Sequence, residues 1–296
     1  MRVPTLKQLR YFVALTEEEH FGRAAEACFV SQSAFSNAIR ELESTLDADL
    51  VDRTSRNVTI TATGQSIATM ARLVLRDVES LVELARGDPE PLCGELRLGV
   101  IPTIAPFLLP GTLPKLRKDY PSLKLLLIED QTQRIYERLM EGELDVLLLA
   151  LPWEMHGVDT TELFRDNFQL AYRQGTKRVD PANYRFNRLN ADSVLLLEDG
   201  HCLRDHALQA CKIRNTQKVS RFGASSLLTL IEMVDADLGI TFLPEMAAGS
   251  SLLRHTRVRL QPLREDSYRT IGLAWRKGSR RGHEFQLLGN YFRDNR

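Results

Sequence analysis

Apolar residues recur at helical spacing through the first sixty residues. Five of them mark one face of a first helix: Leu6, Leu9, Phe12, Val13 and Leu15. A second, alanine-rich helix is expected over about 22–28, and Ser31 is typical of the N-cap of a third helix that reaches about Leu46. Two short helices joined by a tight turn form a helix-turn-helix, whose second helix enters the major groove of DNA.

The start of the third helix carries polar side chains that suit contact with bases. The candidate readers are Gln32, Ser33 and Ser36, with Arg40 one turn later. A glutamine can form two hydrogen bonds with adenine, and a serine can bond a base or a phosphate. Taken singly, each of these residues is better explained as part of a solvated helix face.

A short alternating stretch follows the third helix. Alternation through Val58 and Ile60 predicts a small β-wing, in which Arg53 and Arg56 would contact phosphates. The first sixty residues hold seven basic and nine acidic residues, a net charge of −2. Such a DNA-binding domain must gather its arginines on one face, and we expect it to need dimerisation for affinity.

A heptad pattern comes next, with Thr61 as a plausible N-cap. Its apolar positions alternate in steps of four and three: Ile67, Ala71, Val74, Val78, Leu81 and Ala85. This seam predicts a coiled-coil helix that pairs with a second copy of the chain, and a helix packed on its own domain is the alternative. Residues 87–91, Gly-Asp-Pro-Glu-Pro, end the helix and mark a domain boundary.

From Gly94 onward, strand-like and helical segments alternate. Strands are expected at 96–101, 123–128, 144–151, 168–172, 194–197, about 219–222, 239–243 and 269–275. Helices are expected at 104–120, 133–141, after Cys202, at 227–234 and at 284–292. The alternation predicts an α/β fold with a parallel sheet, in which ligands bind beyond the carboxyl ends of the strands.

Composition is that of an ordinary globular protein. The chain has 296 residues, which suit two or three domains, and 43% of them are hydrophobic and 26% charged. It shows neither an apolar run long enough for a membrane span nor a signal peptide, so we expect a cytoplasmic protein, whose thiols are kept reduced. The four cysteines, at positions 28, 93, 202 and 211, give no zinc signature.

One of these cysteines occupies a chemically suggestive position. Gly200 ends an apolar strand-like run and helical spacing follows, so Cys202 is expected at or just before a helix N-terminus. The partial positive charge of the helix end favours a thiolate there. His201 and Arg204 are close enough in sequence to add to that effect.

Cys211 lies nine residues after Cys202. Along a continuous helix the two are about 13.5 Å apart, whereas a disulfide needs Cα atoms within roughly 7 Å. The two thiols can therefore bridge only if the helix unwinds, which is the arrangement of a switch. From spacing alone, two buried and unreactive cysteines are the preferred alternative.

Two stretches carry a resemblance to a known family. Residues 21–43 (FGRAAEACFVSQSAFSNAIRELE) resemble the DNA-binding domain of the LysR family, although family members often have proline where this chain has Ser33. Residues 200–205 (GHCLRD), followed by Cys211, resemble the redox segment of the hydrogen-peroxide-sensing OxyR group of that family. The resemblance extends over about residues 6–292.

The resemblance implies an α/β fold preceded by an all-α winged helix-turn-helix domain, with a two-subdomain effector domain like that of periplasmic binding proteins. The expected domains are DNA-binding (1–61), coiled-coil dimerisation helix (62–90) and redox-sensing effector (91–296). The effector subdomains are expected at about 91–164 with 269–296, and at about 165–268.

Individual roles also follow from the resemblance. It implies that peroxide oxidises Cys202 and that Cys211 then forms a disulfide with it. It further implies four residues that hold the peroxide: Thr103, Thr132, His201 and Arg269. The chemistry is reasonable, because a thiolate attacks one peroxide oxygen while donors stabilise the departing hydroxide. By position alone, the two threonines are helix caps.

The predicted function is transcriptional control of antioxidant genes in response to hydrogen peroxide. The expected partners are double-stranded promoter DNA, hydrogen peroxide and RNA polymerase, and the resemblance implies a homodimer that assembles into a homotetramer. No cofactor, metal ion, membrane or enzymatic turnover is expected. Two alternatives are a LysR-type regulator that answers a small metabolite between the subdomains, and a thiol peroxidase. The cysteine pair argues against the first, and the DNA-binding head argues against the second.

Overall fold

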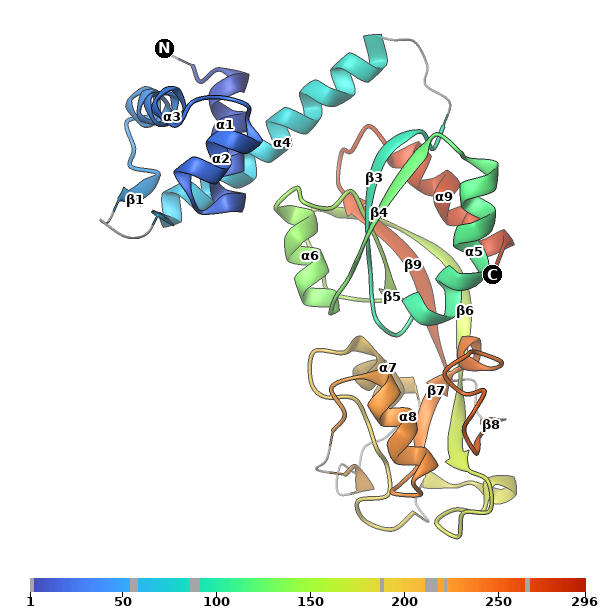
Figure 1. The fold of residues 1–296 in the computed structure, drawn as a ribbon. Coiled ribbons are helices and arrows are strands. Elements are labelled where there is room, and N and C mark those ends of the chain that lie inside the picture. Colours follow the sequence, from blue (N-terminus) through green and yellow to red (C-terminus); the bar gives the residue numbers. More distant parts are fainter. Residues whose placement is uncertain are drawn as a thin grey trace. The chain divides into compact units, whose positions relative to one another are not determined.

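The computed structural model describes residues 3–53, 58–85, 91–186, 189–210, 218–220, 223–263 and 267–296 (Figure 1). The chain forms two compact units, each described by itself. Unit 1 is Met1–Glu90 with Met140–Glu143, and unit 2 is Pro91–Leu139 with Leu144–Arg296. Within the described ranges, no helix combines the length and the apolar character that a membrane crossing requires.

The first unit opens with three helices, as the sequence predicts. They are α1 (Leu6–Glu18), α2 (Phe21–Ala27) and α3 (Gln32–Leu46). Ser31 caps α3, because its hydroxyl accepts a hydrogen bond from the Ala34 N–H at 3.3 Å. The wing follows as two antiparallel strands, β1 (Val51–Arg53) and β2 (Val58–Ile60). The predicted winged helix-turn-helix is confirmed.

One apolar core holds these helices together. Its fully buried side chains include Phe12, Leu15, Phe35, Ile39 and Leu42. The rings of Tyr11 and Phe35 stack with their centroids 5.1 Å apart. Because Phe35, Ile39 and Leu42 share one face of α3, the opposite face is left to solvent or to a partner.

The long helix α4 (Ala62–Ala85) is divided between two environments. Thr61 caps it as predicted, since its hydroxyl accepts the Gly64 N–H at 2.9 Å. In the first half Ala71 is buried, and α4 packs against α1. Further along, Val74 and Leu81 are 39% and 59% exposed. The predicted seam thus packs on its own domain at first and then presents apolar side chains to solvent.

The second unit is built on a sheet with the order β4-β3-β5-β9-β6-β7, and β8 pairs with β6. The strands are β3 (Gly94–Val100), β4 (Leu123–Glu129), β5 (Val146–Leu151), β6 (Val158–Arg173), β7 (Thr241–Pro244), β8 (Val258–Pro262) and β9 (Tyr268–Arg276). Among these strands, β4, β3 and β5 are parallel, whereas β9 is antiparallel to both β5 and β6. The predicted parallel sheet is right for the first three strands and wrong for the others, because β6 and β9 carry the chain out and back.

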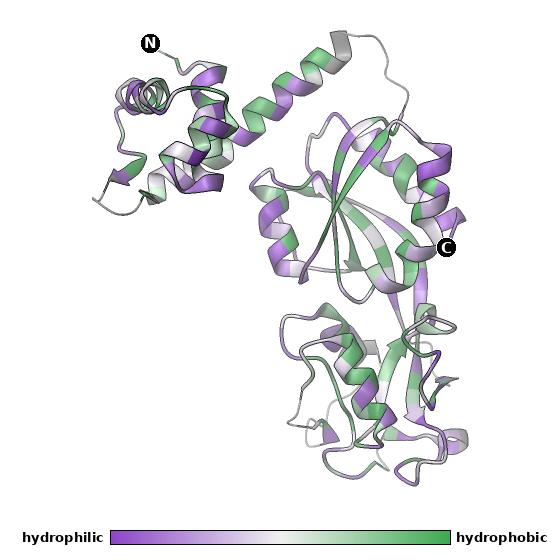
Figure 2. Cartoon of the chain, in the orientation of Figure 1, coloured by the Kyte–Doolittle hydropathy of each residue, from purple (hydrophilic) through white to green (hydrophobic). Residues whose placement is uncertain are grey.

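Helices cover the two ends of this sheet. They are α5 (Ala105–Asp119), α6 (Thr132–Met140), α7 (Cys202–Ala210), α8 (Leu227–Asp235) and α9 (Gly282–Asp294). Figure 1 shows α5, α6 and α9 around β3, β4 and β5, with α7 and α8 beside β7 at the other end. Each end has its own apolar core, and α8 is apolar along most of its length (Figure 2). The unit therefore has two subdomains joined by β6 and β9.

The segment 194–197 is not the regular strand that the sequence predicts. It is buried, but it forms only isolated bridges among the described residues: Val194 with Val219 and Ile240, and Leu197 with Ala224. Burial alone therefore accounts for its apolar pattern. The strand expected at about 219–222 is likewise a single bridge at Val219, and residues 221–222 lie outside the described ranges.

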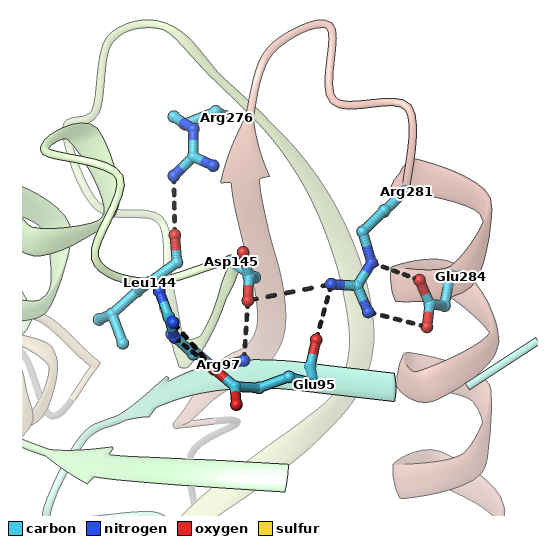
Figure 3. Close-up of polar contacts among 7 residues, drawn as sticks. All are labelled: Glu95, Arg97, Leu144, Asp145, Arg276, Arg281 and Glu284. Carbon is cyan, nitrogen blue, oxygen red and sulfur yellow. Dashed lines mark hydrogen bonds and ion pairs between the residues drawn. The ribbon is translucent and has the colours of Figure 1, made fainter. Parts of the chain in front are cut away.

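A polar network fixes α9 on the first subdomain (Figure 3). Arg281 binds both carboxylate oxygens of Glu284, at 2.6 and 3.0 Å, and donates to the Glu95 carbonyl at 3.0 Å. Nearby, the Arg97 N–H donates to Asp145 at 2.8 Å. These contacts lie at the amino-terminal end of β3, so they leave the carboxyl ends of β3 and β5 free for a site.

We expect Gly272→Ala to destabilise the second unit by about 1–3 kcal/mol. Gly272 lies on β9, where an added Cβ would fall 2.4 Å from Leu151 Cδ1 and 2.7 Å from the Thr161 carbonyl oxygen. Gly111→Ala, on α5, is the control: nothing lies within 4 Å of its Cβ, so it should stabilise the unit by about 0.5–1 kcal/mol. Urea unfolding followed by tryptophan fluorescence reports this unit, which holds both tryptophans. Equal urea midpoints for Gly272→Ala and Gly111→Ala would show that the close packing around Gly272 does not limit the stability of this unit.

Candidate functional site

A buried cation lies where the two subdomains meet. Arg269, at the start of β9, is 2% exposed. Its Nε donates to Asp166 Oδ2 at 3.0 Å, its Nη1 to Thr103 Oγ1 at 2.9 Å and its Nη2 to the Thr103 carbonyl at 2.8 Å. Asp166 stands opposite Arg269 in the ladder between β6 and β9. These bonds join both crossing strands to the loop after β3.

Cys202 is the first residue of α7, as predicted. The chain enters the helix through Gly200, whose φ is +96° and whose added Cβ would lie 2.8 Å from Gln131 Oε1, so this turn requires glycine. Cys202 is buried in the core of the first subdomain, although Leu203 and Ala207 of the same helix pack in the second. The thiol therefore lies at the junction of the subdomains.

The burial of Cys202 opposes the thiolate that the helix end favours. Burial raises the pKa of the Cys202 thiol, and this effect outweighs the Thr132 hydroxyl and the Arg269 charge, which lower it. The helix end is therefore only one of the influences on this thiol, because a sequence does not reveal how fully the sulfur is removed from water.

The sequence neighbours of Cys202 face other groups. Arg204 binds Asp199 at 3.1 Å and the Leu197 carbonyl at 3.2 Å. His201 is buried, and its Nε2 lies 3.5 Å from Gln131 Nε2. Neither side chain is among the groups that shift the pKa of Cys202, and the cation that does so is Arg269.

The two threonines do not act as helix caps. Thr103 accepts its hydrogen bond from Arg269, and α5 begins behind Ile104 without a side-chain cap. Thr132 is the first residue of α6, and its Oγ1 is buried with no hydrogen-bond partner of ordinary geometry in the described part of the chain. It is still near enough to the Cys202 thiol to lower its pKa. A buried hydroxyl in this state suits a small polar ligand beside the sulfur.

Three further residues of this region are not found by the sequence analysis. Asp166 is buried against Arg269, Gln131 lies against Gly200, and His206 is 7% exposed. One signal was present: His206 falls four residues after Cys202 and so shares its helix face. Asp166 stands between Arg165 and Asn167 and gave no such signal. Gln131 gave none, because its contact depends on the fold.

The predicted DNA-reading residues lie on one helix. Gln32, Ser33 and Arg40 are exposed on α3 and Ser36 is half-buried, all away from the helix core. The Arg53 side chain, Arg56 and Cys211 lie outside the described residues. In the described ranges, no group of three His, Cys, Asp or Glu side chains could hold a metal ion.

Two family models match the chain in tandem. Residues 6–65 match the bacterial regulatory helix-turn-helix protein of the lysR family, and residues 89–296 match the LysR substrate binding domain. Together they cover almost all of the chain.

Relatives and solved structures agree with these models. The regulator EstR of Acinetobacter baylyi is 40% identical over 97% of this chain and 95% of its own. The transcriptional dual regulator OxyR of Escherichia coli is 38% identical over 97% of this chain and 94% of its own. A full-length OxyR variant from Pseudomonas aeruginosa matches 99% of this chain and 96% of its own, with a TM-score of 0.84 and 33% identity.

We expect Asp166→Ala to destabilise the second unit by about 3–5 kcal/mol, because it leaves the Arg269 guanidinium buried without its counter-ion. The double variant Asp166→Leu with Arg269→Met should recover most of that loss. Asp294→Ala removes an exposed partner of Arg293 and should cost at most about 1 kcal/mol. Denaturant unfolding of the four proteins measures these differences. An Asp166→Ala loss no larger than that of Asp294→Ala would show that the pair is not essential.

Proposed function

The chain belongs to the LysR family of transcriptional regulators, and from that premise we propose that it senses hydrogen peroxide by oxidation of Cys202 and disulfide formation with Cys211. The observation that carries the proposal is a cation, Arg269, held by Asp166 and Thr103 close to a buried thiol. Relatives named as hydrogen peroxide-inducible genes activators support it.

The first step is a displacement at oxygen. The Cys202 thiol loses its proton, the sulfur attacks one peroxide oxygen, and the O–O bond breaks. The departing hydroxide takes up a proton and leaves as water, so the sulfur is oxidised to a sulfenic acid and the peroxide is reduced. Arg269 and Thr103 stabilise the negative charge on the oxygens, and the Thr132 hydroxyl, beside the sulfur, orients the peroxide. His201 closes the site from the α7 side.

The raised pKa of Cys202 gives the sensor selectivity. A protonated thiol is a poor nucleophile, so the resting site reacts slowly with oxidants in general. Only an oxidant small enough to reach Thr132 and Arg269 gains their stabilisation while the thiolate forms. Hydrogen peroxide meets this condition.

The second step changes the conformation. The Cys211 thiol attacks the sulfenic sulfur, a disulfide forms and water leaves. Since α7 is helical from Cys202 to Ala210, it spans about 12 Å, and it must unwind before the sulfurs can meet. Release of α7 from the junction of the subdomains then alters how the effector domains pack.

This change controls DNA binding. Two copies of the chain pair through the exposed apolar side chains of α4, and the homodimers assemble into tetramers. The α3 helices bind promoter DNA, and Arg53 and Arg56 contact its phosphates. The α3 residues that contact the DNA are Gln32, Ser33, Ser36 and Arg40. RNA polymerase is the partner of the bound regulator in the cytoplasm. One peroxide is consumed in each cycle, so the chain is a regulator rather than a turnover enzyme.

A second candidate is a LysR-type regulator of a small metabolite. It is favoured by the similarity to EstR, which is as high as that to the OxyR relatives. In this case the same residues, Thr103, Thr132 and Arg269, would bind the metabolite and both cysteines would stay reduced.

One equivalent of hydrogen peroxide should convert the reduced full-length chain to a Cys202–Cys211 disulfide. The measurement is alkylation under anaerobic conditions followed by peptide mass mapping. Cys202→Ser should abolish the bond, and Cys211→Ser should trap a sulfenic acid that dimedone labels. Cys93→Ser, a change at a partly exposed cysteine, is the control and should leave the disulfide intact. Two free, alkylatable thiols after peroxide treatment would reject the redox function and favour the metabolite.

Gln32→Ala should flatten base preference at one position of each half-site, at a cost of about 1–3 kcal/mol in discrimination. The readout is selection from a randomised duplex library, followed by affinity measurements at several salt concentrations. The salt dependence should not change, because glutamine carries no charge. Gln133→Ala, on the surface of α6, is the matched control. Unchanged preferences in Gln32→Ala would remove this residue from the reading face.

A further inference from the structure

His206 lies one turn after Cys202, on the face of α7 that packs into the protein. Its Nε2 is 3.2 Å from the Pro152 carbonyl, just after β5, so Nε2 carries a hydrogen and donates it. Nδ1 is then the unprotonated nitrogen. It is buried and has no hydrogen-bond partner within the described ranges.

A proton on Nδ1 would place a positive charge inside this packing. The groups that face His206 are Arg269 on β9, the Pro152 carbonyl, and Asp205 on its own helix. The carbonyl already accepts a hydrogen bond from Nε2, and Asp205 is exposed and has the smallest effect on the imidazole. Burial and, to a smaller extent, the Arg269 charge therefore lower the pKa of His206. The packed form of α7 requires a neutral imidazole.

We propose that His206 couples the thiol–disulfide switch to pH, because α7 excludes a proton from this side chain while packed and admits it when unwound. This inference rests on the proposed function. Reduction of the disulfide takes two electrons and places two protons on the sulfurs of Cys202 and Cys211. If α7 repacks in the same step, His206 releases one proton, and the net uptake is one.

The proton balance gives a measurable slope. At a fixed electrode potential, the reduction equilibrium of an ordinary dithiol changes a hundredfold per pH unit, whereas uptake of one proton gives tenfold, or about 29.6 mV per unit for two electrons. Against glutathione, whose two thiols supply the two protons, an ordinary dithiol shows no pH dependence, and the proton released by His206 alone sets a tenfold slope. The window extends downward from about pH 6.5, the pKa of an unperturbed histidine, to the lowered pKa of packed His206. Acid conditions thus favour the oxidised form more than they would without His206.

Redox titration of the full-length chain against glutathione buffers, from about pH 5 to 7.5, tests this slope. The Cys202–Cys211 disulfide is quantified by mass mapping. Against glutathione, the wild-type equilibrium should shift toward the disulfide about tenfold per unit below about pH 6.5 and should be independent of pH above it. His206→Gln should be independent of pH throughout, and His283→Gln, on the exposed start of α9, should match the wild type. Identical slopes in the wild type and His206→Gln would overturn the proposal.

Hydrogen exchange of the reduced chain decides the matter independently of the disulfide. Because the pKa of His206 is lowered in the packed state, its stabilising contribution is present above about pH 6.5 and is lost as the pH falls. Protection factors of the α7 amides should drop at about pH 5 in the wild type and hold in His206→Gln. If no disulfide forms but α7 still loosens in acid, the redox function fails and the coupling fails with it, whereas the pH-dependent packing of α7 through His206 is retained. Protection that is independent of pH in both proteins would refute it.

Discussion

The buried ion pair between Arg269 and Asp166 is the constraint on which the second unit depends. Both side chains are withdrawn from water, with 0% and 3% exposure, so neither is tolerable without the other. Their bond forms only when β6 and β9 are in register, and the two bonds to Thr103 then fix the loop after β3. Three segments that are far apart in sequence are thereby held at one point, beside the start of α7.

The same burial explains the state of the two titratable groups on α7. Desolvation disfavours any charge, so it raises the pKa of Cys202 and lowers that of His206. Arg269 opposes the first shift and reinforces the second. Desolvation is the largest effect at both groups, so burial disfavours a charge on the sulfur and on the imidazole alike.

Local features of the fold could be predicted from sequence, and long-range ones could not. Ser31 and Thr61 cap helices through hydrogen bonds to residues three positions away, so their spacing reveals them. The direction of β9 and the pairing of Asp166 with Arg269 depend on segments about a hundred residues apart, which no local pattern encodes. Segment 194–197 is a similar case. Its apolar run predicts correctly that the segment is buried, but it does not show whether the segment pairs with neighbouring strands in a regular β-sheet. At the site, the resemblance supplied the residues, but the protonated state of Cys202 required its burial to be known.

The division of α7 between two cores bears on the switch proposed for this helix. It has nine residues, fewer than the 12–15 or so that an isolated helix needs for even marginal stability in water, so packing must hold it in place. Leu203 and Ala207 anchor it in the second subdomain, while Cys202 alone of these three enters the core of the first. Oxidation would replace that apolar contact with a polar sulfenic acid in a dry site, at a cost that burial of the thiol had avoided. In the proposed switch the reacting atom is thus also the contact that joins α7 to the first subdomain, and chemistry at the sulfur would weaken that contact.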